Sequence, residues 1–390
     1  MSSRLSADRP PLRVALLGST GSIGRQAVEV IAAQPDRFRV VALAAGRNDA
    51  LLDAQAARLG DPATTLGGDP AALEAIVARD DVDLVVVATP GIVSLRPVLA
   101  ALAAGKPVAT ANKETLVAGG HLVMPAARAL AAAHAARSDG LGTPLGWLRP
   151  IDSEHSAIWQ CLVGEDPSAI AALVLTASGG PFLDTPDEAL AVVTPSDALR
   201  HPTWSMGAKI TVDSATLANK GLEVIEARWL YDVDDDAIEV VIHPQSVVHS
   251  AVRFVDGSLK AQLGTPDMRL PIQYALTYPE RRPSPAAAPD LVDIGRLEFR
   301  APDLDRFPAL RIAREAGRSG PRASAALIAA DDVAVGRFLD GELDFPGIPR
   351  LLEAAVARFG AGPPPDADEL VELDAEVRAA FAGRTVAGRP

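Results

Sequence analysis

The 390-residue sequence contains a single cysteine, Cys161, so no disulfide can form within the chain. This thiol lies inside the apolar run "IWQCLV", which favours a core residue over a nucleophile. No run of about 18 apolar residues occurs, and the first residues, "MSSRLSADRPP", lack the apolar core of a signal peptide. These absences predict a cytoplasmic protein with no membrane contact.

Clustered positive charge is absent as well. Asp and Glu number 50 against 37 Lys and Arg, which gives a formal net charge of −13. Nucleic-acid binding needs Lys and Arg grouped against phosphates, so we expect no nucleic-acid partner. A small anionic ligand is compatible with this charge, because a few cations can dominate one pocket. A chain of this length exceeds a single hydrophobic core and predicts two or three domains.

Short apolar runs alternate with helical patterns through about residue 150. Residues 12–17, 38–45 and 82–89 read as buried strands. A helical pattern follows the first strand, another at 94–104 follows the third, and 125–137 is a further helical stretch. Strands that alternate with helices form βαβ units around a parallel sheet. The predicted fold class is therefore α/β, and it begins with a Rossmann-like parallel-sheet domain.

The pattern changes after residue 150. Residues 171–178 and 238–263 are strand-like, and Asp256-Gly257 is a hairpin signal, so we expect a central α/β domain with a mixed sheet. A Pro-rich connector with one short strand follows, and three helical patterns close the chain, the second entered at Pro349. The predicted segments are a parallel-sheet domain, a catalytic domain, a connector and a helical domain, over 1–150, 151–280, 281–305 and 306–390.

Gly18, Gly21 and Gly24 lie between the first strand and the first helix, in a G-x-x-G-x-x-G spacing. Such a loop allows a tight turn and close approach of backbone amides to a pyrophosphate at a helix N-terminus. An NAD site usually has an acid at the end of the second strand, but here Gly46-Arg47-Asn48 occupies that place. A cation there suits a 2′-phosphate and favours NADPH, although Arg47 could also be a solvated loop residue.

The stretch "IDSEH" places Asp152 and Glu154 two positions apart. In an extended segment both carboxylates would point to one side, where they could bind a hard cation such as Mg²⁺ or Mn²⁺. A third ligand could come from Glu223 or Glu226, which follow in a helical pattern that begins near Ser214. The alternative is that these are ordinary surface or capping acids.

The same helical segment contains groups that suit a phosphate. Ser214, Asn219 and Lys220 offer a hydroxyl, an amide and an ammonium, and Ser178 stands beside two glycines in "TASGGP". Gly221 costs about 1 kcal/mol in a helix interior, which suggests that another group must approach the backbone there. Together these residues predict a phosphorylated substrate next to a metal ion and a hydride donor.

Seven stretches carry a resemblance to one family. They are "GSTGSIG", "AGRN", "ANKETLV", "IDSEHSAIWQ", "TASGGPF", "HPTWSMGAKITVDSATLANKGLEVIEARWL" and "IHPQSVVHSAVRFVDGS". In this order they resemble the 1-deoxy-D-xylulose 5-phosphate reductoisomerase family over nearly the whole chain. The resemblance implies NADPH- and metal-dependent rearrangement and reduction of that sugar phosphate to 2-C-methyl-D-erythritol 4-phosphate. It also implies a homodimer with much of its interface in the strand-rich middle region.

The resemblance also implies a role for each matching residue. The metal ligands would be Asp152, Glu154 and Glu223, which favours Glu223 over Glu226, and Lys113 would be catalytic beside the substrate. The substrate contacts would include Lys113, Ser153, Glu154, Ser178, His201, Trp204, Ser214, Asn219, Lys220 and Glu223, with 201–207 as a mobile lid in which Met206 packs nearby. The NADPH contacts would be Thr20, Gly21, Ser22, Ile23, Gly46, Arg47, Asn48, Asn112, Glu114 and Gly207.

Three stretches depart from the family pattern: 85–93, Thr115, and "IAADDVAV" at 328–335, where Ile328, Asp331 and Asp332 replace the usual Asn, Asn and Glu. His155, His243 and His249 are expected to make structural hydrogen bonds. Two other functions stay open on sequence alone. One is a metal-free NADPH-dependent reductase, and the other is a non-enzymatic NADPH-binding sensor.

Overall fold

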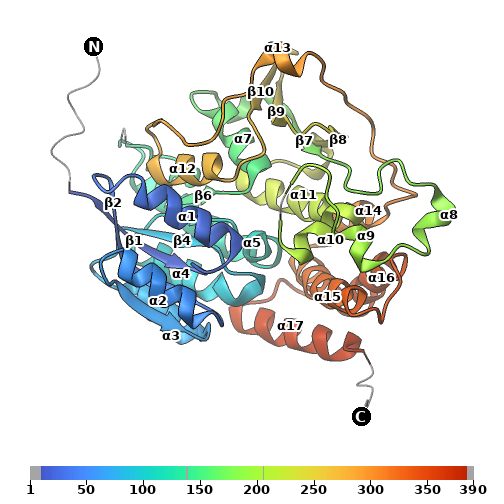
Figure 1. Cartoon of the computed structure of the whole chain (residues 1–390), viewed down its shortest axis with the longest axis horizontal. Coiled ribbons are helices and arrows are strands. Elements are labelled where there is room, and N and C mark those ends of the chain that lie inside the picture. Colours follow the sequence, from blue (N-terminus) through green and yellow to red (C-terminus); the bar gives the residue numbers. More distant parts are fainter. Residues whose placement is uncertain (1–9, 138, 205, 384–390) are drawn as a thin grey trace. The chain divides into compact units, whose positions relative to one another are not determined.

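The computed structural model describes residues 10–137, 139–204 and 206–383 (Figure 1). The described chain forms two compact units. The first contains the chain up to Asn112, Met124–Asp152 and Met268–Ala286, and the second contains Lys113–Val123, Ser153–Asp267 and the chain from Ala287 onward. The four-segment division of the sequence stays a prediction.

The first unit is built on a six-stranded parallel sheet in the order β3-β2-β1-β4-β5-β6. The predicted parallel sheet is thus confirmed, and β1 and β4 are the neighbours at which the strand order reverses. Apolar residues bury the central strands completely, as in Val14–Leu17. The strands are β1 (Leu12–Leu17), β2 (Phe38–Ala45), β3 (Ala63–Leu66), β4 (Leu84–Val87), β5 (Val108–Thr110) and β6 (Leu148–Pro150).

Helices that follow the strands cover this sheet. They are α1 (Ser22–Ala32), α2 (Asp49–Arg58), α3 (Pro70–Ala78), α4 (Leu95–Ala103) and α6 (Pro144–Trp147), joined by α12 (Arg269–Thr277) from much later in the chain. The buried Arg149 fastens α12 to the sheet edge by donating to the carbonyls of Ala275 and Gly146, both at 2.9 Å. Burial lowers the pKa of Arg149 to about 10.

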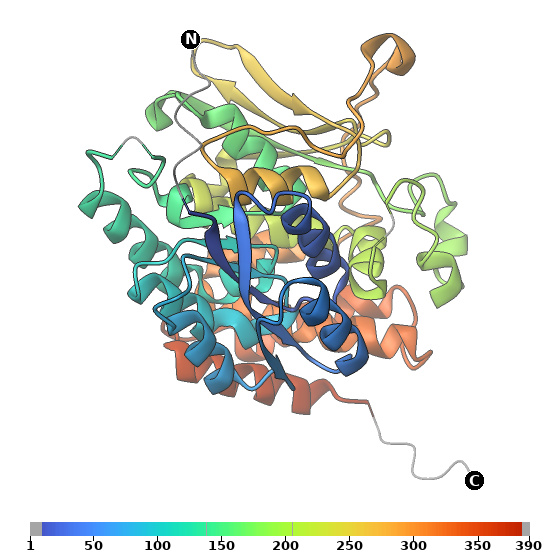
Figure 2. The same cartoon turned by 60° about the vertical axis from the view of Figure 1, so that its left-hand side comes forward.

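The second unit contains a mixed sheet in the order β10-β9-β7-β8. β7 pairs in parallel with β8 and antiparallel with β9, and the β9–β10 hairpin turns at Gly257, where φ is +85° (Figure 2). Both the mixed sheet and the hairpin are confirmed. The strands are β7 (Ile170–Ala177), β8 (Ile238–Ile242), β9 (Val248–Phe254) and β10 (Leu259–Leu263).

The helical part of the second unit differs from expectation. Four long helices close the described chain instead of three, because Gly320-Pro321 splits one pattern into two; Pro349 lies in the first turn of the third helix. The predicted connector strand is wrong, since described residues 280–305 hold only an isolated bridge from Arg300 to Ile242. The helices are α13 (Leu291–Ile294), α14 (Ala309–Ser319), α15 (Pro321–Leu339), α16 (Gly347–Phe359) and α17 (Ala367–Phe381).

Helix α5 (Lys113–Ala133) begins well before the predicted start near residue 125. A non-helical residue, Gly119, kinks it. Of the described helices, α5 alone is long and apolar enough to cross a membrane by length and composition, and half of that apolar stretch is buried, as in many core helices. Only the part of α5 up to Val123 belongs to the second unit. The other helices of this unit are α7 (Ser153–Leu162), α8 (Asp187–Leu190), α9 (Pro195–Ala198), α10 (Ala208–Thr216) and α11 (Ala218–Tyr231).

The helix expected from Ser214 onward is two helices. Leu217 adopts φ 60°, a left-handed conformation that ends α10 and starts α11. Gly221 in α11 has a packing reason, because a Cβ there would lie 2.4 Å from the Cβ of Ala313 in α14. The group that approaches this backbone is therefore a neighbouring helix.

Two helical glycines give a matched test of this packing. Gly221→Ala should lower the free energy of unfolding by about 1–3 kcal/mol, because it overpacks the α11–α14 contact. Gly336→Ala in α15, where a Cβ meets open space, should raise it by about 0.5–1 kcal/mol. Urea unfolding of both variants checks the pair, and equal shifts would contradict the packing argument.

Candidate active site

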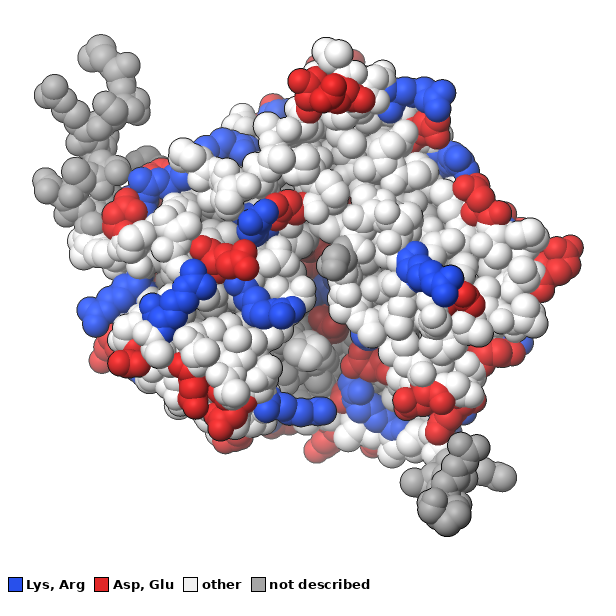
Figure 3. Space-filling model, in the orientation of Figure 1, with Lys and Arg blue, Asp and Glu red and all other residues white. Residues whose placement is uncertain are grey.

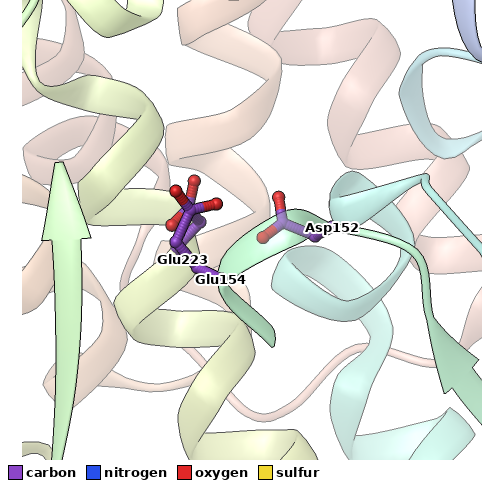
Figure 4. Close-up of side chains that lie close together, drawn as sticks. All are labelled: Asp152, Glu154 and Glu223. Carbon is purple, nitrogen blue, oxygen red and sulfur yellow. The ribbon is translucent and has the colours of Figure 1, made fainter. Parts of the chain in front are cut away.

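Three carboxylates converge where α7 begins. Asp152, Glu154 and Glu223 each place a ligand oxygen such that all three oxygens lie within 4.8 Å of one another, and Figure 4 shows them pointing together. Glu223 is fully buried, whereas the other two are partly exposed. Such a set of hard oxygen donors suits a divalent cation that keeps open positions for substrate.

The local structure around "IDSEH" corrects the sequence interpretation. Asp152 follows β6 in a bend, and Glu154 is in the first turn of α7, so the two acids do not share one face of an extended segment. A strand-to-helix turn brings them together instead. The Ser153 hydroxyl donates to Glu154 Oε2 at 2.6 Å and holds that carboxylate in place.

Two lysines and an amide surround Glu223. Lys113 at the start of α5 donates to Glu223 Oε1 at 3.2 Å and to Asn219 Oδ1 at 2.6 Å. Lys220 pairs with Glu223 Oε2 and lies 3.5 Å from Glu154. Asn219 Nδ2 completes the set by donating to Glu223 Oε1 at 2.6 Å. These cations offset a buried negative charge that would otherwise be costly.

Helical spacing explains why these residues meet. Asn219 and Lys220 precede Glu223 by four and three positions in α11, so all three side chains lie on one face. Glu226 lies further along the helix and pairs with His155, with 3.1 Å between His155 Nε2 and the carboxylate. Of the two candidates from the sequence, Glu223 is the one in the acidic cluster.

A second polar cluster forms where β7 ends. His201 Nε2 lies 3.0 Å from Ser178 Oγ and 3.2 Å from Ser214 Oγ. Gly180 permits this arrangement, because its φ is +69° and a Cβ there would lie 2.7 Å from the Ser214 carbonyl oxygen. The "SGG" sequence therefore brings Ser178 close to the backbone of α10.

The backbone fixes the tautomer of His201. The amides of Thr203 and Trp204 donate to His201 Nδ1 at 3.1 and 2.9 Å, so the ring proton must reside on Nε2, which faces the two serines. Burial lowers the pKa of His201, which also favours the neutral ring. The ring of Trp204 lies 6.0 Å from that of His249. Ser205, within the expected lid, lies outside the described residues.

The glycine loop of the first unit meets the demands of a dinucleotide site. Gly18 has φ +83°, and a Cβ there would lie 2.5 Å from the Ala88 carbonyl oxygen at the end of β4. A Cβ on Gly24 would lie 2.1 Å from the Gly18 carbonyl oxygen, so α1 packs tightly on the loop. Gly21 caps α1, and Thr20, Ser22 and Ile23 lie at the helix entrance, all at least partly exposed.

The end of β2 presents an exposed cation. Gly46, Arg47 and Asn48 are exposed, and Asn48 caps α2 by accepting from the Leu51 amide at 3.1 Å. The loop at 88–91 lies within the stretch that departs from the family pattern. Asn112 holds this loop, because its side-chain amide donates to the carbonyls of Thr89 and Gly91 at 2.6 and 2.7 Å. Glu114 and Gly207 belong to the second unit, in the first turn of α5 and at the cap of α10.

Two of the histidines expected to be structural, His243 and His155, contact backbone or buried side chains. His243 Nδ1 donates to the Glu298 carbonyl at 2.8 Å, and its Nε2 accepts from the Val247 amide at 3.2 Å. His155 is fully buried against Glu226, and the Tyr231 hydroxyl donates to the His155 carbonyl at 2.5 Å. The sequence analysis did not predict the contact between His155 and Glu226. The position of Glu226, one helical turn after Glu223, was the pattern that could have indicated it.

These features define a class: a dinucleotide-binding α/β protein with a candidate divalent-metal site. Family models agree with that class. The 1-deoxy-D-xylulose 5-phosphate reductoisomerase model matches residues 14–66 and 59–120, its C-terminal domain matches 148–231, and the DXP reductoisomerase C-terminal domain matches 263–380. The chain belongs to the 1-deoxy-D-xylulose 5-phosphate reductoisomerase family.

Individual relatives are similar over nearly their full length. The reductoisomerases of Pelotomaculum thermopropionicum and Heliobacterium modesticaldum are 47% and 48% identical, with 93% and 97% of this chain and 95% and 98% of theirs covered. A Zymomonas mobilis reductoisomerase solved with NADPH has a TM-score of 0.83 at 36% identity. A reductoisomerase solved with NADPH, fosmidomycin and magnesium has 0.83 at 37%. Each structural match covers 95% of this chain and 97% of the other.

The two nitrogens of His201 can be tested separately. Asn at 201 keeps an acceptor near the Nδ1 position, whereas Gln reaches the Nε2 position and loses the acceptor for the Thr203 and Trp204 amides. Losing two backbone hydrogen bonds of about 1 kcal/mol each should make limited proteolysis within 202–207 about thirtyfold faster in His201→Gln than in His201→Asn. Equal cleavage rates in the two variants would contradict the assignment of His201 Nδ1 as the anchor of the Thr203 and Trp204 amides.

Proposed function

We propose that this chain converts 1-deoxy-D-xylulose 5-phosphate to 2-C-methyl-D-erythritol 4-phosphate by an NADPH- and divalent-metal-dependent rearrangement and reduction. The convergence of three carboxylates beside two lysines carries the proposal. Family membership supports it, because the relatives carry that enzyme name and two solved relatives contain NADPH. An oxidoreductase that also rearranges its substrate needs a hydride donor and a Lewis acid. The glycine loop suits the binding of the hydride donor, and the three carboxylates suit a Lewis-acidic metal ion.

Asp152, Glu154 and Glu223 would hold Mg²⁺ or Mn²⁺. The fit rests on the donor chemistry, since three carboxylate oxygens form a hard site and the fully buried Glu223 gains a counter-charge. When bound, the ion supplies Lewis acidity and a fixed template for substrate oxygens, and NADPH supplies the hydride. Because the ion would then neutralise Glu223, the ammonium groups of Lys113 and Lys220 would be available to stabilise negative charge on the substrate.

NADPH would bind the first unit at the glycine loop. The pyrophosphate would meet the amides at Gly21, Ser22 and Ile23 with the Thr20 hydroxyl nearby, and the 2′-phosphate would meet Gly46, Arg47 and Asn48. The Gly18 and Gly24 contacts, which leave no space for a Cβ, keep this backbone close enough for the pyrophosphate. Asn112, Glu114 and Gly207 would complete the cofactor contacts.

The phosphate of the substrate would lie against the second polar cluster. Ser178, Ser214 and the Nε2–H of His201 form one set of donors, and Asn219 and Lys220 add an amide and a cation. Residues 201–207 would act as the lid, with Trp204 covering the substrate and Met206 packing nearby, and Ser153 would contact it beside Glu154. Binding energy from the phosphate would close the lid and exclude water from the reacting carbons.

The working form would be a cytoplasmic homodimer that contacts neither membrane nor nucleic acid. The β9–β10 hairpin, whose edge exposes Val255 and Leu259, supports a subunit interface in this region. Blue and red side chains are interspersed on the face drawn in Figure 3, which supports a partner other than nucleic acid. Light scattering on the purified protein tests the dimer, because a monomeric mass would reject it.

One assay tests the function and the metal site together. NADPH absorbance should fall with 1-deoxy-D-xylulose 5-phosphate only when Mg²⁺ or Mn²⁺ is present, and Glu223→Gln should lower kcat at least about 10²-fold, because it removes a charged ligand. NADPH binding, followed by fluorescence, should stay nearly unchanged. Glu165→Gln, at a surface ion pair with Lys260, is the matched control. Turnover that survives exhaustive chelation would favour a metal-free reductase instead.

Cofactor choice can be tested at the end of β2. Arg47→Ala should reduce kcat/KM for NADPH about 10- to 100-fold, because a charge-assisted contact to the 2′-phosphate is lost, and leave NADH nearly unaffected. Arg39→Ala removes another exposed cation, near the opposite end of β2, and should change neither value. Steady-state kinetics with both cofactors measure the ratio, and an unchanged ratio in Arg47→Ala would refute the assignment.

A further inference from the structure

The stretch "IAADDVAV", which departs from the family pattern, faces a lysine of the substrate-binding helix. Lys209 in the first turn of α10 lies 2.8 Å from Asp213, contacts Asp331 directly, and lies 3.6 Å from Asp332. Asp213 and Asp331 keep 3% and 1% of their side-chain surface exposed, whereas Lys209 keeps 31%. The departure therefore places two acids of α15 against α10.

A second layer of ion pairs continues this network to the C-terminal helix. Arg378 in α17 lies 2.6 Å from Asp332 and 2.6 Å from Asp374. Figure 1 shows α10, α15 and α17 in succession, and the ion pairs follow that succession. Arg378 is thus shared between Asp332 and Asp374, and Lys209 is the cation in contact with Asp213 and Asp331.

The charges at the centre do not balance if every acid is ionised. One ammonium contacts two buried carboxylates, Asp213 at 2.8 Å and Asp331 directly, and thereby brings the two acids together on the same Nζ. Among the described residues, Asp213 Oδ1 and Asp331 Oδ1 are buried and receive no donor. One proton between the two carboxyl groups would satisfy both oxygens and leave a single negative charge for Lys209.

The expected titration agrees with this geometry. Burial raises the pKa of Asp213 and of Asp331, and each is raised further by a neighbouring carboxylate while Lys209 opposes the shift. Burial alone would lower the pKa of Lys209, but its surrounding acids raise it well above the ordinary value. The pair titrates as a unit, and Lys209 stays charged throughout.

The other charged groups around the pair are accounted for. Glu114 in α5 interacts with Lys209 and Asp332, and burial raises its pKa. On α11, which packs against α10, Lys220 and Glu223 pair with each other. On α9, Asp197 lies 3.7 Å from Arg200. The groups that face the pair most directly are thus Lys209 and Asp332.

We propose that Asp213 and Asp331 share one proton beneath Lys209, and that this shared proton locks α10 onto α15 and so positions Ser214 and the lid for the substrate phosphate. α10 starts at the last residue of the lid, Gly207, and carries Ser214, whose hydroxyl meets His201. Lys209, Asp213 and Asp331 are positioning residues in this account. The role in phosphate binding rests on the proposed function, whereas the shared proton does not.

Loss of the proton has a defined direction. Because the folded-state pKa is raised, the stabilisation is complete below the ordinary Asp value of about 3.9 and is lost as pH rises through the raised value. Two adjacent carboxylates then repel each other in a buried site. The wild-type protein should lose stability as pH rises through the raised pKa of the pair, and its KM for 1-deoxy-D-xylulose 5-phosphate should rise about tenfold over the same pH range.

The isosteric variant Asp331→Asn is the decisive experiment. Its amide donates to Asp213 without titrating, so this loss should disappear, and Tm above the raised pKa of the pair should exceed that of the wild type by about 2–4 °C. The infrared signal of one protonated carboxyl, present in the wild type below that pKa, should be lost in this variant. Asp331→Leu, which leaves Asp213 Oδ1 without a donor, should be destabilised at all pH values.

Asp374→Asn is the matched control, because it weakens an Arg378 ion pair one layer away from the shared proton. It should lower Tm without changing the pH dependence or the infrared band. Wild-type and Asp331→Asn proteins with the same dependence of Tm on pH and the same infrared spectrum would overturn the proposal. Absence of turnover with the sugar phosphate would instead overturn the proposed function, and the Tm and infrared results would still decide the shared proton.

Discussion

The structure around the candidate active site depends on keeping a negative charge inside the protein. Glu223 is fully buried, so its carboxylate needs compensation from every direction. Lys113 comes from the start of α5, and Lys220 and Asn219 come from the same face of α11. Glu154, at the start of α7, adds a second negative charge that Lys220 also faces. Three separate elements must therefore end or begin at this point, and the left-handed residue Leu217 sets where α11 begins.

Much of the fold could be predicted because short patterns in the sequence determine it. Uninterrupted apolar runs identified the central parallel strands, and Asp256-Gly257 identified the β9–β10 hairpin. The glycine spacing identified a loop whose close contacts the structure displays at Gly18 and Gly24. Among the acids, residue type and proximity in sequence were enough to single out Asp152 and Glu154 before any geometry was known.

Other features depend on long-range packing that no local pattern contains. "IDSEH" is compatible with a strand, but the chain turns into α7 there because His155 and Trp159 pack into the core. The apolar helix α12 joins the parallel sheet from more than a hundred residues later, held by Arg149. The break at Leu217 was invisible because leucine rarely adopts a positive φ, so only the surrounding tertiary structure can impose it.

The single cysteine described at the outset has a practical consequence for spectroscopy. Cys161 is buried inside α7, so the native surface of the described chain offers no thiol to a bulky maleimide or nitroxide reagent. One cysteine introduced at an exposed position would carry a label alone, with the natural residue left in place. Distances from the lid to a fixed helix could then be recorded on an otherwise unaltered protein.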